Sequence, residues 1–144
     1  MPAKITKVTK TEYEMLAALR YSLRQFLRFS EEAAQLVGLT PQQHQALLAI
    51  KGFPKRDRVT IGEFAERLQV RHHSAVGLAD RLVGKDLVER KQDTTDRRQA
   101  YLTLTRRGEE LLEKLSAAHK EQLRRIGPHI ESLLKRLRGQ AVGM

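Results

Sequence analysis

The sequence has no cysteine and no tryptophan, and aromatic residues make up only 5% of its 144 positions. Because cysteine is absent, disulfide bonds, thiolate metal sites and peroxide sensing by a thiol are excluded. No apolar run approaches the length that spans a membrane, and residues 1–5 lack the apolar core of a signal peptide. These absences lead us to expect a cytoplasmic protein.

Charge, by contrast, is abundant and unevenly distributed. Charged residues make up 31% of the chain and hydrophobic residues 40%, which suits a helical, heavily solvated protein with one core. The net charge is +10, and residues 53–107 hold its largest share, with 13 basic and 8 acidic groups. Such a segment is where a polyanion would bind, although a generally basic protein has the same total. Charge alone therefore leaves both interpretations open.

Residues 60–82 have the pattern of two short helices joined by a tight turn. The apolar positions of each helix recur at helical spacing, and Gln69-Val70 separates the two sets. The second helix is predicted to begin near Arg71 or His72. Such a pair is a helix-turn-helix, whose second helix can enter the major groove of DNA. The apolar positions are Ile61, Phe64, Ala65 and Leu68 in the first helix, and Ala75, Val76, Leu78, Ala79 and Leu82 in the second.

A β-hairpin is predicted directly after these helices. Val88 and residues 101–104 are β-prone, and residues 93–99 between them are polar and basic, as expected for a hairpin tip. Val59-Thr60 is predicted as a short strand against this hairpin. A helix-turn-helix followed by a basic hairpin is a winged helix, so the predicted fold class is mainly α with a small β wing.

Long amphipathic helices are predicted on both sides of the winged helix. The first spans residues 11–37, with Thr11 and Glu14 as its capping box, and would extend roughly 40 Å at 1.5 Å per residue. Its length favours packing on a second subunit over folding back on its own domain alone. Gly38 is expected to end it, and Thr40-Pro41 to begin the next helix.

The chain after the hairpin is predicted to form two further helices. Thr105 is the expected N-cap of the first, and Gly108 is an early glycine that this helix tolerates. Gly127-Pro128 is expected to break the apolar pattern, so that a separate last helix follows and ends near residue 138.

Four fragments between residues 80 and 108 form a series. They are Asp80-Arg81-Leu82-Val83, then Leu87-Val88-Glu89-Arg90, then Asp96-x-Arg98 followed by Leu104-Thr105-x-x-Gly108. In this order and at these distances they resemble the MarR family of winged helix-turn-helix transcriptional regulators. The resemblance extends through the flanking helices and covers nearly all of residues 1–144. It implies a DNA-binding lobe at residues 53–107 and a helical dimerisation lobe at residues 11–37 and 106–138.

Two positions depart from the family pattern. Family members usually have glycine just after the recognition helix, where this chain has Asp86. Aspartate tolerates the left-handed conformation better than most residues, so the turn is expected to form. Arg71 replaces the usual small polar cap and cannot accept a hydrogen bond from the first amides of the helix.

The resemblance implies a homodimer that binds double-stranded DNA. A two-fold dimer would present two recognition helices to half-sites roughly 34 Å apart. The implied function is repression of a palindromic operator, with release by a small-molecule effector, in the nucleoid of a bacterial or archaeal cell. The alternative is an architectural or partner-binding winged-helix protein without an effector.

Candidate DNA contacts on the recognition helix lie at its start and along one face. They are Arg71, His72, His73, Ser74, Gly77 and Arg81. Arg81 suits guanine edges or a phosphate, and glycine at 77 would let the helix approach the groove. The alternative for Arg81 is an intramolecular ion pair near Asp80 or with the wing. His72 and His73 are adjacent and point in different directions on a helix, which favours DNA-facing groups over a metal site.

Candidate wing contacts are Arg97 and Arg98. An arginine at a hairpin tip fits the negative potential of a narrow minor groove. The resemblance implies that Asp96 orients the wing and that an arginine beside it reaches DNA. The alternative is a solvated, charged turn.

Neither an enzyme nor a cofactor is predicted. The sequence has no glycine-rich phosphate loop and no paired-carboxylate motif, and no two histidines stand four apart to bind a metal on a helix. The resemblance implies a small aromatic or anionic effector between the dimerisation helices and the DNA-binding lobe. Tyr21, Arg24 and His44 are the candidates there, with core packing for Tyr21 and a solvated position for Arg24 as alternatives.

Overall fold

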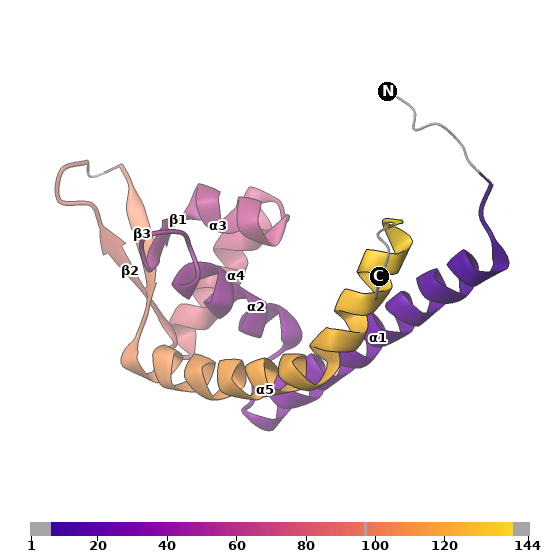
Figure 1. Cartoon of the computed structure of the whole chain (residues 1–144). Helices are drawn as coiled ribbons and strands as arrows, with labels where there is room; N and C mark the ends of the chain where they lie inside the picture. The colour runs from indigo at the N-terminus through magenta and orange to yellow at the C-terminus, as the bar shows by residue number, and fades with distance from the viewer. Residues whose placement is uncertain (1–6, 97, 140–144) are drawn as a thin grey trace. The chain divides into compact units, whose positions relative to one another are not determined.

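A computed structural model of the chain describes residues 7–96 and 98–139 and is drawn in Figure 1. It confirms the predicted fold class, because eight elements form a mainly helical protein with one small sheet. In order they are α1 (Lys10–Leu36), α2 (Pro41–Lys51), β1 (Arg58–Thr60), α3 (Ile61–Leu68), α4 (His72–Gly84), β2 (Val88–Gln92), β3 (Ala100–Leu104) and α5 (Arg106–Leu137).

The chain divides into two compact units. The first consists of residues Met1–Ser30 and Ala118–Met144, and the second of residues Glu31–Ala117. The second unit therefore holds the whole helix-turn-helix, formed by α3 and α4, and the whole sheet. The two units are described separately below.

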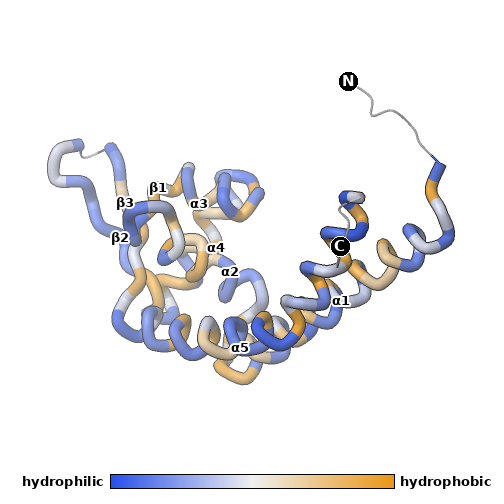
Figure 2. The backbone as a smooth tube through the Cα atoms, viewed as in Figure 1, coloured by the Kyte–Doolittle hydropathy of each residue, from blue (hydrophilic) through white to orange (hydrophobic). Residues whose placement is uncertain are grey.

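The sheet of the second unit has three antiparallel strands in the order β1-β3-β2. Val59 lies opposite Leu102 and Thr60 opposite Tyr101, which confirms the short strand predicted before the helix-turn-helix. In β3 the buried Leu102 and Leu104 alternate with half-buried Tyr101 and Thr103, so one face of the sheet packs on the core. Figure 1 shows the β2–β3 hairpin projecting beyond helices α2, α3 and α4, and Figure 2 shows its tip as mostly hydrophilic.

The core of the second unit is built from one face of each element. Apolar burial is the main favourable contribution to folding, and here it joins the three short helices to the sheet and to the first part of α5. The largest fully buried side chains are Phe64, Leu47, Ile50, Leu78, Leu82, Leu87, Leu102, Val59 and Val88.

Two short helices begin with complete capping boxes. Thr40 caps α2 with Pro41 at its first position, as predicted, and the Gln43 side chain closes the box. Thr60 ends β1 and caps α3, and the Glu63 carboxylate accepts the Thr60 amide at 2.9 Å. One threonine thus turns the chain from strand to helix without a linker.

The predicted capping box of α1 is wrong by two residues, and the helix begins at Lys10 rather than at residue 11. Thr9, not Thr11, is the capping residue, since its hydroxyl accepts the Glu12 amide at 3.1 Å and the Glu12 carboxylate accepts the Thr9 amide at 2.9 Å. Thr11 and Glu14 repeat the same spacing two residues later, so the sequence offered two equivalent boxes. The predicted end is confirmed, because Gly38 has φ +80° and the Leu39 amide donates to the Ala34 carbonyl at 2.9 Å.

The predicted break at Gly127-Pro128 is also wrong. Helix α5 continues through Pro128 to Leu137, although proline removes one backbone donor and costs about 3 kcal/mol in a helix interior. Ile126, Ile130 and Leu133 are half-buried or buried and recur at helical spacing on both sides of the proline. An apolar face that continues past the proline offsets the local penalty.

The first unit contains a histidine packed among aromatic rings. The His119 Nε2 atom lies 2.8 Å from the Ser30 hydroxyl oxygen. The same ring meets Phe26 and Phe29 edge-on, with centroids 5.7 Å and 5.2 Å away. Several large apolar side chains of this unit stay exposed, namely Val8, Tyr13, Leu16, Tyr21, Leu23, Leu27, Leu123 and Leu134.

Candidate nucleic-acid interface

The recognition helix α4 begins at His72 with Arg71 as N-cap, within the range predicted from the sequence. Arg71 makes no side-chain capping bond, as its chemistry requires. At the other end Asp86 has φ +60°, and the Leu87 amide donates to the Leu82 carbonyl at 3.0 Å. Aspartate therefore adopts the left-handed turn that usually belongs to glycine, which confirms the expectation for this position.

One face of α4 packs on the core and the other carries the candidate contact residues. Ala75, Leu78, Ala79 and Leu82 are buried, whereas Arg71, His72, His73, Ser74 and Arg81 are exposed. None of these five exposed side chains makes a hydrogen bond or ion pair within residues 7–96 and 98–139.

Arg81 lies back along its own helix over Gly77. A Cβ atom built at Gly77 would stand 3.6 Å from the Arg81 Nη1 atom, which is ordinary van der Waals contact. Ser74, Gly77 and Arg81 share one side of α4, because they stand three and four residues apart.

The ion pair that joins α4 to the wing is made by Asp80, not by Arg81. The Asp80 carboxylate lies 2.6 Å from the Arg90 guanidinium on β2. Sequence reasoning overlooked Arg90, although strand alternation places it on the same face as the buried Val88. Since Arg81 has no acidic partner in the described part of the chain, its guanidinium stays available.

The wing tip is shaped by two aspartates. The Asp96 carboxylate accepts the Arg98 amide at 3.0 Å and the Arg98 Nε at 3.2 Å. Asp93 accepts the amide and the hydroxyl of Thr95, and these two hydrogen bonds hold the pKa of the Asp93 carboxyl below its ordinary value. The Arg98 side chain is 91% exposed. Arg97, the other predicted wing contact, lies outside the described residues.

Residues of the wing and of the start of α4 line one hollow. It has a volume of about 340 Å³, and its walls include His72 from the helix and Arg98 from the wing. The remaining walls come from Thr60, Ile61, Gln99 and Ala100. Two residues predicted independently as DNA contacts therefore border one concave surface.

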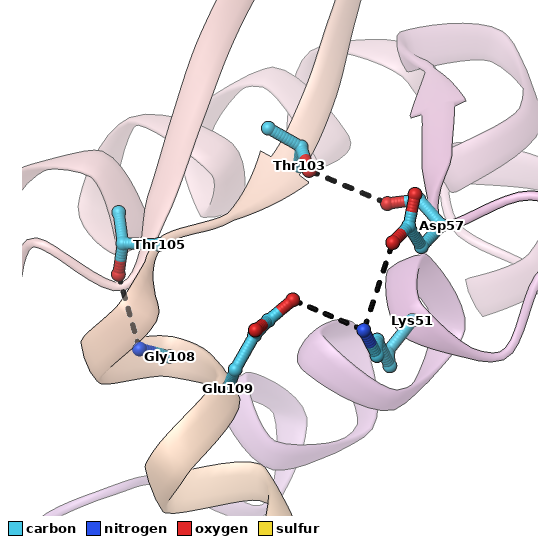
Figure 3. Close-up of polar contacts among 6 residues, drawn as sticks. All are labelled: Lys51, Asp57, Thr103, Thr105, Gly108 and Glu109. Atoms are coloured by element: carbon cyan, nitrogen blue, oxygen red, sulfur yellow. Dashed lines mark hydrogen bonds and ion pairs between the residues drawn. The ribbon is translucent and has the colours of Figure 1, made fainter.

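Figure 3 shows polar contacts between the base of the wing and helices α2 and α5. The Lys51 ammonium at the end of α2 lies 3.0 Å from the Glu109 carboxylate on α5 and 3.6 Å from the Asp57 carboxylate before β1. The hydrogen bond to Glu109 raises the pKa of Lys51 above its ordinary value. The Thr103 hydroxyl of β3 donates to the Asp57 carbonyl at 3.4 Å. These surface contacts join four segments, each with a small stabilising effect.

Helix α5 begins directly on the turn that follows α4. The Thr105 amide donates to the Leu87 carbonyl at 3.0 Å, and its hydroxyl donates to the Asp86 carbonyl at 2.7 Å. The same hydroxyl accepts the Gly108 amide at 3.0 Å, which confirms Thr105 as the N-cap (Figure 3). A Cβ atom at Gly108 would stand 2.2 Å from the Leu87 carbonyl oxygen, so this position requires glycine rather than merely tolerating it.

The three effector candidates fall in different units. Tyr21 and Arg24 are exposed on the part of α1 that belongs to the first unit, whereas His44 is buried in α2 of the second. Their grouping in one pocket stays a prediction. Within the described residues there is no cluster of three or more potential metal-ligating side chains, and no helix long and apolar enough to cross a membrane.

Comparison with known sequences finds relatives of this winged helix. A sequence model of the MarR family matches residues 37–99. Over 89 residues the chain is 35% identical to the HTH-type transcriptional repressor MdtR of Bacillus subtilis (strain 168). That match covers 62% of this chain and 56% of the repressor, so it spans little more than half the length of this curated relative.

Solved structures share the fold over nearly the whole chain. The YusO protein from Bacillus subtilis is 25% identical with a TM-score of 0.68, and the alignment covers 91% of this chain and 99% of YusO. A mutant of S. aureus MepR bound to an oligodeoxyribonucleotide is 19% identical with a TM-score of 0.68, covering 92% and 98%. At that identity the second likeness concerns the fold alone.

Proposed function

Because this chain belongs to the MarR family of winged helix-turn-helix transcriptional regulators, we propose that it is a homodimeric repressor of a palindromic operator in double-stranded DNA. We propose further that a small-molecule effector releases it from that operator and that it acts in the cytoplasm, on the nucleoid.

The exposed face of α4 is the observation that carries this proposal. Ser74 and Arg81 stand seven residues apart on one side of the helix and have no partner within the described chain. Polar side chains without intramolecular partners on a recognition helix are suited to base edges in the major groove. The MepR mutant, which shares the fold, is itself bound to an oligodeoxyribonucleotide.

The wing is assigned to the neighbouring DNA backbone and minor groove. Arg98 is exposed beside the hollow that His72 also borders, and Asp96 holds its backbone and side chain. Phosphate contacts fix the register of a protein on DNA, whereas base contacts specify the sequence. We therefore assign specificity to α4 and positioning to the wing, with Arg97 as a further contact and Asp96 as its orienting residue.

Dimerisation is supported by the exposed apolar side chains of the first unit. Tyr13, Leu27 and Leu123 expose 59%, 56% and 45% of their surface. Large apolar side chains that stay exposed in one unit favour an interaction site there. A second copy of the chain fits this surface, because a two-fold dimer would also supply the second recognition helix that a palindrome requires.

Selection of bound fragments from a random duplex library tests the central claim. The purified protein should enrich a palindrome with half-sites about one helical turn apart and bind it about 10³-fold or more tightly than a scrambled duplex. Equal affinity for both duplexes at the same salt concentration would favour an architectural protein and contradict a sequence-specific repressor.

Effector control is tested with the selected operator. A ligand that binds one conformation preferentially should lower operator affinity by about 5–150-fold, the range of typical coupling free energies. Tyr21, Arg24 and His44 are the residues whose substitution should weaken that response. A screen of metabolites and phenolic acids in which none shifts operator affinity would leave repression without an effector.

A further inference from the structure

The recognition helix is held by few directional contacts. Its buried face, which comprises Ala75, Leu78, Ala79 and Leu82, packs through apolar burial, which is strong but non-directional. Within residues 7–96 and 98–139, α4 and its C-cap make side-chain polar contacts at two positions. Asp80 pairs with Arg90 of the wing, and Lys85 reaches in the opposite direction along the chain, to the turn between α1 and α2.

Lys85 joins the end of α4 to two acceptors that are distant in sequence. Its ammonium donates to the Gly38 carbonyl at 3.0 Å and to the Gln43 amide oxygen at 3.1 Å. Gln43 is 6% exposed, and the same oxygen accepts the Thr40 amide at 3.1 Å in the capping box of α2. Both acceptors are neutral oxygens, so the contact is a pair of hydrogen bonds rather than an ion pair.

We propose that Lys85 is a positioning residue for operator recognition, because its bonds to Gly38 and Gln43 set the tilt of α4 within the DNA-binding lobe. This inference rests on the proposed function and names a determinant of its specificity. The turn after Lys85 is fixed from the other side too, since the carbonyls of Asp86 and Leu87 accept the Thr105 hydroxyl and amide. The C-terminal end of α4 is therefore the anchored end.

A small rotation of α4 at its C-terminal end displaces its N-terminal end. Helix α4 has 13 residues, or a length of about 20 Å at 1.5 Å per residue. A tilt of about 3° at Lys85 would displace His73 and Ser74 by about 1 Å, which is enough to spoil hydrogen bonds that require accurate placement. Phosphate attraction depends much less on such a displacement, so discrimination should fall while non-specific affinity remains.

The test compares Lys85→Met with Lys114→Met, which removes one exposed positive charge elsewhere in the same unit. Lys85→Met should lower affinity for the selected operator about 5–50-fold more than Lys114→Met does. The two variants should bind the scrambled duplex with equal affinity. Its urea midpoint should remain close to that of the wild type. An equal effect of both variants on both duplexes would overturn the inference.

Gln43 variants test the route of the effect. Gln43→Met removes the acceptor and should reduce discrimination, as Lys85→Met does. The double variant should lose less than the sum of the two single losses, because both substitutions break the bond between Lys85 and Gln43. Gln43→Glu keeps an acceptor for both Lys85 and the Thr40 amide, so it should retain discrimination. Additive losses, or a loss in Gln43→Glu equal to that in Gln43→Met, would contradict the proposed contact. Gln43→Met leaves the ammonium on Gly38 and keeps the inference testable if Lys85→Met fails to fold.

Amide hydrogen exchange in the free protein separates this inference from the proposed function. Lys85→Met should accelerate exchange at residues 38–40 and 84–87 but not in the wing strands. If the wild type has no preferred duplex, the proposed repressor function fails and the specificity role of Lys85 fails with it. If the wild type discriminates and neither exchange nor discrimination changes in Lys85→Met, this inference alone fails.

Discussion

The Asp80 carboxylate of α4 lies 2.6 Å from the Arg90 guanidinium of β2. This pair joins the helix that carries the candidate base contacts to the hairpin that carries Arg98. Both side chains are partly exposed, so the pair contributes orientation more than stability.

Asp80→Asn should therefore change DNA discrimination without unfolding the protein. We expect stability to fall by less than about 1 kcal/mol and operator affinity by about fivefold, on the order of 1 kcal/mol. Affinity for scrambled duplex should stay equal or rise, because the variant loses a negative charge beside DNA. Titration of both duplexes and urea unfolding check this, and a parallel loss on both duplexes would argue against an orienting role.

Gly108→Ala should destabilise the second unit, because the new methyl group would collide with the Leu87 carbonyl oxygen. We expect a loss of about 1–3 kcal/mol in the free energy of unfolding. Gly84→Ala is the matched control, since a Cβ there meets nothing within 4 Å at the end of a helix, and it should stabilise by up to about 1 kcal/mol. Equal urea midpoints for the two variants would refute this account.

The wing and the recognition helix should respond differently to salt. Arg98→Ala, and likewise Arg97→Ala, should weaken operator and scrambled duplex alike and lower the log-log salt slope by about one per lost phosphate contact. Arg81→Ala should cost about 1–3 kcal/mol on the operator specifically if it makes a bidentate base contact. Salt titrations of each variant on both duplexes decide this, and specificity that disappears only in the wing variants would reverse the assignment.

Glu63 should make stability depend on pH in the acid range. Burial alone would raise the pKa of its carboxyl, but the hydrogen bond from the Thr60 amide and the ion pair with Arg56 outweigh burial and lower it. Because the folded pKa lies below the unfolded value, the stabilisation is complete above about pH 4.5 and is lost as the pH falls through the folded pKa.

Glu63→Gln should therefore lose less stability than the wild type on acidification from pH 6 to pH 3. We expect a difference below about 1 kcal/mol, since both partners of the ion pair are about one-third exposed. Arg56→Met should reduce the acid dependence in the same direction. Urea unfolding at each pH measures it, and an acid slope that is unchanged in both variants would exclude Glu63 as its source.

Leu27→Glu should dissociate the proposed dimer. Leu27 is exposed on α1 in the first unit, where a second copy would cover it, and a buried unpaired carboxylate is costly. Leu48→Glu, at a site of similar exposure on α2, should leave the oligomeric state unchanged. Sedimentation of both variants tests this, and a wild-type monomer or an intact Leu27→Glu dimer would refute the proposed interface.

The local features that the sequence predicted correctly share one property, namely that their determinants lie within a few residues of each other. The Thr40 cap needs only Pro41 and Gln43, and the left-handed turn at Asp86 depends on a conformation that aspartate tolerates. The β-prone run at residues 101–104, which lies in β3, likewise depends on neighbouring residues. The same locality misplaced the start of α1, because Thr9-x-x-Glu12 and Thr11-x-x-Glu14 are equivalent as sequences.

The remaining features depended on partners far along the chain. Pro128 stays inside α5 because apolar burial on both sides of it offsets the cost of a proline in a helix. The sequence shows only that local cost. The Leu87 carbonyl requires glycine at 108, and Asp80 pairs with Arg90. Lys85 donates to Gln43 and Gly38, which precede it by 42 and 47 positions. The sequence by itself determined the winged helix and its exposed basic residues, since periodicity and turn chemistry are local. Only the tertiary structure decided which side chains hold that surface in place, because packing alone brings distant groups within bonding distance.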